Sequence, residues 1–91
     1  MTVKVRYSGL ARAAAGKAAE EFSLSSGADL NSLLAEISRR HGTTMQALLA
    51  TTERGVPAAL IFIADEQISA HAPITLKDQD SIMILSPISG G

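Results

Sequence analysis

The sequence predicts a small α+β domain in which one main helix packs across a mixed sheet of four to five strands. Three observations predict this class: period-two alternation at the N-terminus, one strongly amphipathic helix in the middle, and two apolar strand-like runs after it. The chain has 91 residues, 46% of them hydrophobic, which fits one folded domain. The apolar faces are buried most simply if the helix lies on the sheet.

The first two strands are expected to form a hairpin. Val3, Val5 and Tyr7 alternate with polar residues, which is the pattern of a strand with one buried face. Residues 9–16 are expected to form a loop with a helical turn across its alanines, and residues 21–25 alternate again as the returning strand.

The best-defined element is a helix that begins after Asp29 and ends before Gly42. Asp29 is a favourable N-cap, and Gly42 tolerates the positive φ that ends many helices. One face of the helix is apolar at helical spacing, with Leu30, Leu33, Leu34 and Ile37. Arg39, Arg40 and His41 fill the last turn. We interpret the two arginines as a solvated helix terminus favoured by the helix dipole, and His41 as dipole-stabilised or solvated rather than a ligand. Docking of the two arginines on an acidic partner is the alternative.

The second half of the chain is expected to complete the sheet. A short helix over residues 43–50 precedes the apolar run 58–64, whose length and β-branched residues predict a strand. A very short strand at 67–68 and a last strand at 81–85 follow. Parallel pairing of the first and last strands at the centre gives the β-grasp (ubiquitin-like) arrangement.

The composition argues against several classes of function. Cysteine is absent, which excludes disulfides, thiolate metal sites and a cysteine nucleophile. With a formal charge of −1, one Tyr, two Phe and no Trp, the chain lacks the basic stripe and stacking platforms of nucleic-acid binding. No apolar run approaches a membrane span, and the N-terminus lacks the apolar core of a signal peptide. We therefore expect a cytoplasmic protein that binds neither nucleic acid nor membrane.

Catalytic and metal-binding clusters are not expected in this chain. His41 and His71 lie far apart in the sequence, without thiols or carboxylates at ligand spacing. The acidic residues at 65–66 and 78–80 fit turns, where Asp caps backbone groups, better than acid–base catalysis. We expect no bound metal or cofactor and no turnover by the isolated chain.

The chain is expected to divide into a globular domain over residues 1–85 and a flexible tail over residues 86–91. The tail ends in two glycines, which lack Cβ atoms and can pass a narrow channel, while Pro87 restricts the stalk before them. Six residues extend at most roughly 20 Å. This geometry favours delivery of the Gly91 carboxylate into the active site of another protein.

A terminal carboxylate needs activation before it can react. Its pKa is about 3.3–3.7, so it is ionised and unreactive toward nucleophiles at neutral pH. An acyl-adenylate made from ATP by a partner enzyme is the most economical activation, because this chain has no Gly-rich phosphate loop. The activated acyl group can then take up sulfide, giving a thiocarboxylate, or an amine, giving an isopeptide.

The sequence resembles the MoaD/ThiS family of sulfur carriers. Its last segment, DQDSIMILSPISGG at residues 78–91, has the acidic turn, apolar strand and proline-containing tail that precede the terminal diglycine in that family. The segment YSGLARAAAG at residues 7–16 resembles the family's first strand and following loop. With the helix between them, the resemblance spans nearly the whole chain.

The resemblance implies that a ubiquitin-activating-type enzyme adenylates Gly91, using ATP and a sulfur donor to form a thiocarboxylate. The thiocarboxylate would then donate sulfur in biosynthesis, with the larger subunit of a synthase or another sulfur-accepting enzyme as the second partner. The tail that enters these partners would comprise Pro87, Ile88, Ser89 and Gly90.

The length favours the small subunit of molybdopterin synthase among the branches of this family. Ser86 replaces a proline that is frequent in that branch, and residues 84–85 replace frequent aromatics. Sulfur carriers for cysteine, thiamine, thio-siderophore or tRNA thiolation remain alternatives. A ubiquitin-like covalent modifier, or a β-grasp binding module with an incidental tail, would also fit.

By analogy with ubiquitin, the face of the sheet opposite the helix is expected to dock partners. Strand alternation places four apolar residues there: Leu60, Phe62, Met83 and Leu85. The intervening residues Ile61, Ile63, Ile82 and Ile84 would point toward the helix. An exposed apolar patch that leads to the tail is typical of a docking surface.

Overall fold

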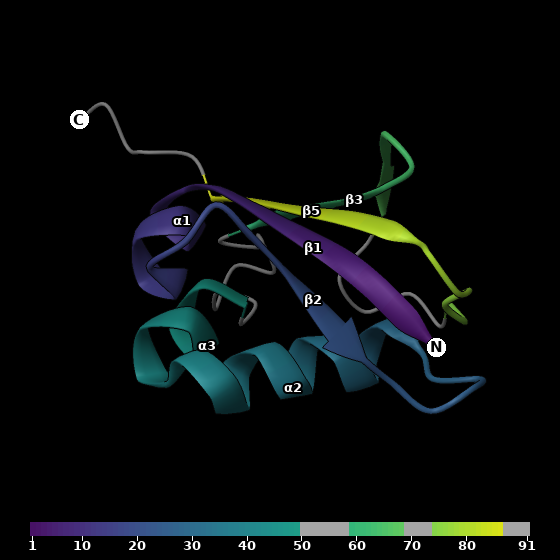
Figure 1. Cartoon of the computed structure of the whole chain (residues 1–91). Coiled ribbons are helices and arrows are strands. Elements are labelled where there is room, and N and C mark those ends of the chain that lie inside the picture. The colour runs from purple at the N-terminus through teal and green to yellow at the C-terminus, as the bar shows by residue number, and fades with distance from the viewer. Residues whose placement is uncertain (50–58, 69–73, 87–91) are drawn as a thin grey trace.

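The computed structural model describes residues 1–49, 59–68 and 74–86, and predictions that concern other residues, including Pro87–Gly91 and His71, lie outside this part. The described elements are, in order, β1 (Thr2–Gly9), α1 (Leu10–Ala15), β2 (Ala19–Ser23), α2 (Leu30–His41), α3 (Thr43–Leu49), β3 (Leu60–Ile63), β4 (Glu66–Ile68) and β5 (Ser81–Ser86). The strands form one mixed sheet in the order β2-β1-β5-β3-β4, and α2 and α3 lie on one side of it (Figure 1). This is the predicted α+β, β-grasp fold.

Parallel pairing of β1 with β5 sets the centre of the sheet. It runs from Lys4 opposite Ser81 to Gly9 opposite Ser86, as the sequence predicts. The other three pairings, β2 with β1, β3 with β5 and β4 with β3, are antiparallel. The last described strand is therefore held between two neighbours.

The core lies between the sheet and α2. Its sheet side includes Val3, Val5, Tyr7, Phe22, Ile61, Ile82 and Ile84, and its α2 side consists of Leu30, Leu33, Leu34 and Ile37. All of these are buried, and each large aliphatic side chain among them contributes about 1.5–3 kcal/mol by leaving water.

The caps of α2 confirm its predicted ends. The Asp29 side chain accepts a hydrogen bond from the Ser32 backbone N–H at 2.8 Å, and this bond holds the pKa of the Asp29 carboxyl below its ordinary value. At the other end Gly42 has φ 84°, and its N–H donates to the Ser38 carbonyl. Glycine is suited to that position because a side chain there would be strained.

The turn before β5 also behaves as predicted, with aspartates binding backbone groups. Asp78 Oδ1 accepts from the Thr2 N–H at 2.8 Å, and Asp80 Oδ2 accepts from the Lys77 N–H at 2.8 Å. These carboxylates fix the turn against the start of β1. Their role here is structural.

Several boundaries differ from the sequence predictions; strand β3, for example, begins at Leu60 and ends at Ile63, inside the predicted run 58–64. Residues 10–15 form the short helix α1 rather than a loop with a single turn, and Gly16 ends it in the left-handed region at φ 74°. Strand β2 begins at Ala19 and ends at Ser23, two residues earlier at each end than predicted, and Glu20 on this strand points into the molecule, against the expected pattern of charged residues outward. The turn between β3 and β4 falls on Ala64 and Asp65, so β4 already begins at Glu66.

None of the helices in the described residues combines the length and the apolar composition that crossing a membrane requires.

Candidate functional site

Four half-buried apolar side chains lie together on the outer face of the sheet, opposite α2. They come in cross-strand pairs, with Leu60 opposite Leu85 and Phe62 opposite Met83. We call these four residues the outer patch. Their neighbours Ile61, Ile82 and Ile84 point to the other side and are buried, which is the alternation that the sequence indicates. The docking role of the outer patch stays a prediction.

The outer patch lies next to the point where the described chain ends. Leu85 is followed by Ser86, which is buried and lies opposite Gly9, the residue before α1. Strand β5 thus extends one residue beyond the expected end of the globular part. The five remaining residues, from Pro87 to Gly91, span at most roughly 17 Å when extended. We call this edge of the sheet the tail end.

A small hollow adjoins the outer patch at the opposite end of β5. It has a volume of about 140 Å³ and is lined by Arg6, Phe62, Ala64, Asp65, Ser81 and Met83. Because two of its lining residues belong to the outer patch, a side chain of a docking protein can insert there beside apolar surface. The hollow is too small for a cofactor of nucleotide size.

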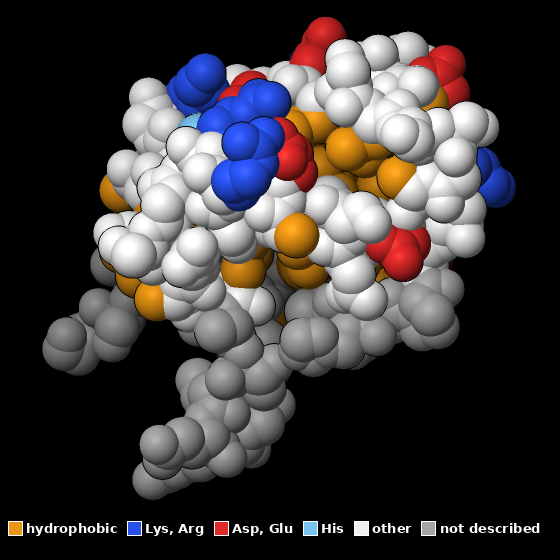
Figure 2. Space-filling model, turned by 90° about the horizontal axis from the view of Figure 1, so that it is seen from below, with side chains coloured by type: hydrophobic (Ala, Val, Ile, Leu, Met, Phe, Trp, Pro, Cys, Tyr) orange, Lys and Arg blue, Asp and Glu red, His pale blue; other side chains and the backbone are white. Residues whose placement is uncertain are grey.

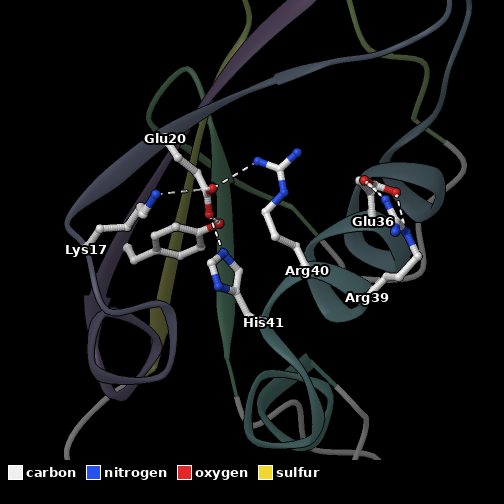
Figure 3. Close-up of polar contacts among 7 residues, drawn as sticks. Lys17, Glu20, Glu36, Arg39, Arg40 and His41 are labelled. Atoms are coloured by element: carbon white, nitrogen blue, oxygen red, sulfur yellow. Dashed lines mark hydrogen bonds and ion pairs between the residues drawn. The ribbon is translucent and has the colours of Figure 1, made fainter.

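A cluster of polar side chains on the helix side of the sheet was not predicted from the sequence. Glu20 of β2 binds four side chains, and we call the group of Tyr7, Lys17, Glu20, Arg40 and His41 the Glu20 cluster (Figure 3). The Tyr7 O–H donates to Glu20 Oε2 at 2.6 Å, and His41 Nε2 contacts the same oxygen. The other oxygen, Oε1, accepts from Arg40 at 3.0 Å and lies 3.9 Å from Lys17 Nζ.

Burial and partner contacts oppose each other at Glu20. The side chain is 7% exposed, and burial alone would raise the pKa of the carboxyl. Hydrogen bonds from Tyr7, His41 and Arg40 outweigh that burial and lower its pKa below the ordinary value. Burial, together with the neighbouring carboxylate, raises the pKa of the Tyr7 phenol far above its usual range. The carboxylate is therefore ionised and the phenol neutral at physiological pH.

Ring contacts complete the Glu20 cluster. The Arg40 guanidinium lies 4.1 Å from the centre of the Phe22 ring, a cation–π contact. The rings of Tyr7 and His41 meet edge to face with centroids 5.8 Å apart. These contacts connect β1, β2 and the last turn of α2.

Of the two interpretations of His41, solvated or stabilised by the helix dipole, the solvated one is wrong, and the interpretation of Arg40 as solvated is incomplete. The His41 side chain is only 9% exposed because it packs between Tyr7 and Glu20. Arg40 is partly exposed but joins Glu20 and Phe22. Arg39 does remain on the surface, where it pairs with Glu36. Figure 2 shows Lys and Arg side chains gathered beside the described histidine on the helix side.

The Glu20 cluster is structural rather than catalytic by its geometry. Its polar groups bind one another, and within the described residues no buried side-chain nitrogen or oxygen lacks a partner. The described residues also contain no group of three or more His, Cys, Asp and Glu side chains arranged to hold a metal ion. A signal for the cluster was present in the sequence: Glu20 stands two residues before the buried Phe22 and so shares its face.

The fold and the outer patch define the class of protein. A five-stranded β-grasp sheet with a helix across one face and an apolar patch on the other is the architecture of a ubiquitin-like protein. The sequence profile described as the ThiS family matches residues 5–91. The chain belongs to this family, which comprises ubiquitin-like sulfur carriers and modifiers.

Solved structures agree with this assignment. A protein from Pyrococcus furiosus, assigned as molybdopterin converting factor, subunit 1, is 28% identical with a TM-score of 0.76, covering 97% of this chain and 99% of its own. The small archaeal modifier protein 1 from Methanosarcina acetivorans is 25% identical with a TM-score of 0.74, covering 99% and 96%. CysO from Mycobacterium tuberculosis, 21% identical with a TM-score of 0.66 and covering 94% and 99%, shares the fold. A sequence search of curated proteins gives no match.

Proposed function

We propose that this protein is a sulfur carrier whose Gly91 carboxylate is adenylated by a ubiquitin-activating-type enzyme and converted to a thiocarboxylate. The observation that carries the proposal is the ThiS family match, which runs through the whole C-terminal segment to Gly91. The structure of the described part supports it, because β5 holds the start of that segment in the centre of the sheet, beside the outer patch.

The proposed chemistry balances in two steps on the partner enzyme. The Gly91 carboxylate attacks the α-phosphorus of ATP, forming an acyl-adenylate and releasing pyrophosphate. A sulfur donor then supplies sulfide, which attacks the acyl carbon, and AMP leaves. ATP and the sulfur donor are used by the partner, in the cytoplasm, and the carrier itself holds no cofactor. Its own contributions are the reactive end and the surface that docks.

The outer patch is proposed to dock both the activating enzyme and the sulfur-accepting enzyme. Apolar side chains that are only half-buried in the free protein gain burial on docking, and large ones such as Phe62 are typical anchors. The tail of Pro87, Ile88, Ser89 and Gly90 then reaches the active site of the docked enzyme. The same surface serves two partners in turn, so only one can be bound at a time.

Synthesis of molybdopterin is the pathway that we propose first. The 28% identical Pyrococcus protein is assigned as subunit 1 of the molybdopterin converting factor, and it matches over nearly all of both chains. The accepting enzyme would then be the larger synthase subunit, which supplies most of the active site. A sulfur carrier for cysteine, thiamine, thio-siderophore or tRNA thiolation would use the same thiocarboxylate at Gly91.

Covalent protein modification is the second candidate function. The 25% identical Methanosarcina protein, which matches over the whole chain, is a small archaeal modifier protein. Here the activated Gly91 carbonyl passes to a lysine amine instead of sulfide, and the product is an isopeptide.

Mass spectrometry of the intact protein separates the two candidates. The chain is incubated with its activating enzyme, ATP and a sulfur source, and we expect a mass gain equal to exchange of one oxygen for sulfur, confined to the C-terminal fragment. Omission of ATP is the control. Conjugates to other proteins without this exchange favour the modifier, and an unchanged mass with no conjugates contradicts both.

A further inference from the structure

Among the described residues, Leu10 is the one large hydrophobic side chain that is exposed, at 42%. It is the first residue of α1, the short helix that lies at the tail end of the sheet, with α3 beneath it (Figure 1). Ala11 anchors α1 in the core, whereas Leu10, Ala13 and Ala14 share another face of the helix, because residues three and four positions apart are neighbours. This face carries no charged side chain, and the core uses only part of it.

The same face of α1 borders a hollow between α1 and α3, which we call the end hollow. It has a volume of about 350 Å³, and the described residues that line it are Leu10, Ala13, Ala14, His41, Thr44 and Leu48. These described lining residues include no carboxylate, lysine or arginine, and His41 already contacts Glu20 through its Nε2 atom. The end hollow is therefore suited to an apolar side chain rather than to a charged ligand.

The side of the end hollow opposite α1 is held in place by packing. On α3, Met45 is fully buried and Leu48 packs against the core. At the end of α2, His41 is held between Tyr7 and Glu20. Because these contacts exist before any partner binds, a docked side chain has little to order and loses little of its binding free energy.

The length of the tail decides which surfaces an enzyme must approach to reach Gly91. Ser86 lies opposite Gly9 in the parallel pairing, so the Cα atom of Leu10 is within roughly 9 Å of the Cα atom of Ser86. The five residues after Ser86 span at most roughly 17 Å. An enzyme that encloses Gly91 must place the entrance to its active site nearer to Ser86 than that, so the rim of the entrance comes close to Leu10.

From this placement we propose that Leu10 and the end hollow dock the activating enzyme, which inserts an apolar side chain between α1 and α3. The inference rests on the proposed function, and it adds a second apolar contact on the helix side, whereas the outer patch lies on the opposite face of the sheet. Contacts on both sides of Ser86 fix the direction in which the tail enters the enzyme. A second copy of this chain is not the occupant, because it would obstruct the exit of the tail.

Removal of the apolar contact should weaken docking without changing the chemistry. We expect Leu10→Ala to raise the KM for the carrier about tenfold, with little change in kcat, because a buried apolar anchor contributes much of the affinity of an interface. Ala13→Gln places a polar amide at the mouth of the end hollow and should raise KM about fivefold. Release of pyrophosphate by the activating enzyme measures both constants.

Ala35→Gln is the matched control for Ala13→Gln, because it makes the same change at an exposed helical position that lies neither in the end hollow nor in the outer patch. It should leave KM within about twofold of wild type. Thermal unfolding checks that each variant keeps its fold. A wild-type KM in Leu10→Ala or Ala13→Gln, or an equal rise in Ala35→Gln, would overturn the inference. A dimer of the free chain that Leu10→Ala dissociates, seen by sedimentation, would also overturn it.

Binding of the carrier to the same enzyme without ATP separates this inference from the proposed function. Binding that weakens in Leu10→Ala and Ala13→Gln, with no adenylation of Gly91 after ATP is added, supports the docking inference and rejects the proposed function. Adenylation together with binding that neither substitution changes rejects the docking inference alone. An absence of both binding and adenylation rejects both.

Discussion

The two faces of the sheet differ in how far their apolar side chains are buried and in whether their charged side chains are paired. On the helix side apolar residues are buried in the core, and the charges of the Glu20 cluster pair with one another. On the outer face Leu60, Phe62, Met83 and Leu85 are only half-buried, and Arg6 has no described carboxylate as a partner. A small domain can hold its fold with one face alone, which leaves the other free for recognition.

The largest effect on stability is expected at Ile84 of β5, and its neighbour Leu85, which points to the opposite face of the sheet, is the comparison. Ile84→Ala removes fully buried methyl groups and should lower the free energy of unfolding by about 2–4 kcal/mol. Leu85→Ala, on the half-buried side, should cost less than about 1.5 kcal/mol but weaken binding of the activating enzyme. Urea denaturation and a binding titration measure both, and equal losses of stability would contradict the division of the faces.

The neighbouring residues Glu20 and Glu21 allow a second comparison, between a buried and an exposed carboxylate of β2. Glu20→Gln removes a carboxylate charge that pairs with Arg40 and Lys17, and it should cost about 2–3 kcal/mol because the side chain at position 20 is only 7% exposed. Glu21→Gln, one residue further and exposed, should change the stability by less than about 0.5 kcal/mol. The cluster has no structural role if both variants unfold at the same urea concentration.

The same carboxylate should make stability depend on pH. Because the folded state lowers the pKa of Glu20, its ionised form stabilises the fold above its ordinary pKa of 4.5, and this contribution is lost as pH falls through the lowered value. Urea denaturation between about pH 6 and pH 2 should show a steeper acid loss for wild type than for Glu20→Gln. Parallel curves would mean that Glu20 does not titrate differently in the folded state.

The smallest effect is expected on the exposed surface of α2. Within the described residues Arg39 pairs only with Glu36, and its side chain is 74% exposed, so Arg39→Ala should leave the urea midpoint unchanged within error. Arg40→Ala, one residue along, also removes the contact with Phe22 and should lower the midpoint. A loss from Arg39→Ala that matches the loss from Arg40→Ala would contradict the account of this turn.

Much of this fold follows from local signals in the sequence. The N-cap at Asp29, the apolar stripe after it and the glycine at 42 place α2 correctly, because capping and periodicity are properties of the segment itself. Alternation likewise assigns residues of β3 and β5 to the correct faces.

The Glu20 cluster escaped prediction because its contacts join residues that are distant in the chain. Period-two alternation treats a glutamate as outward-facing, whereas the fold provides Tyr7, Arg40 and His41 as partners for Glu20 only once β1 and α2 have packed around it. The same contacts bury His41, which its position at the end of the helix had suggested to be dipole-stabilised or solvated.

The central claim is that the Gly91 carboxylate is the reactive group. The most direct test is intact-mass and fragment analysis of the full chain after incubation with its activating enzyme, ATP and a sulfur source. The account predicts one sulfur-for-oxygen exchange on Gly91, absent from a variant that lacks Gly90 and Gly91 but retains the wild-type urea midpoint. An active protein whose mass never changes, or which works equally well without those two residues, would contradict it.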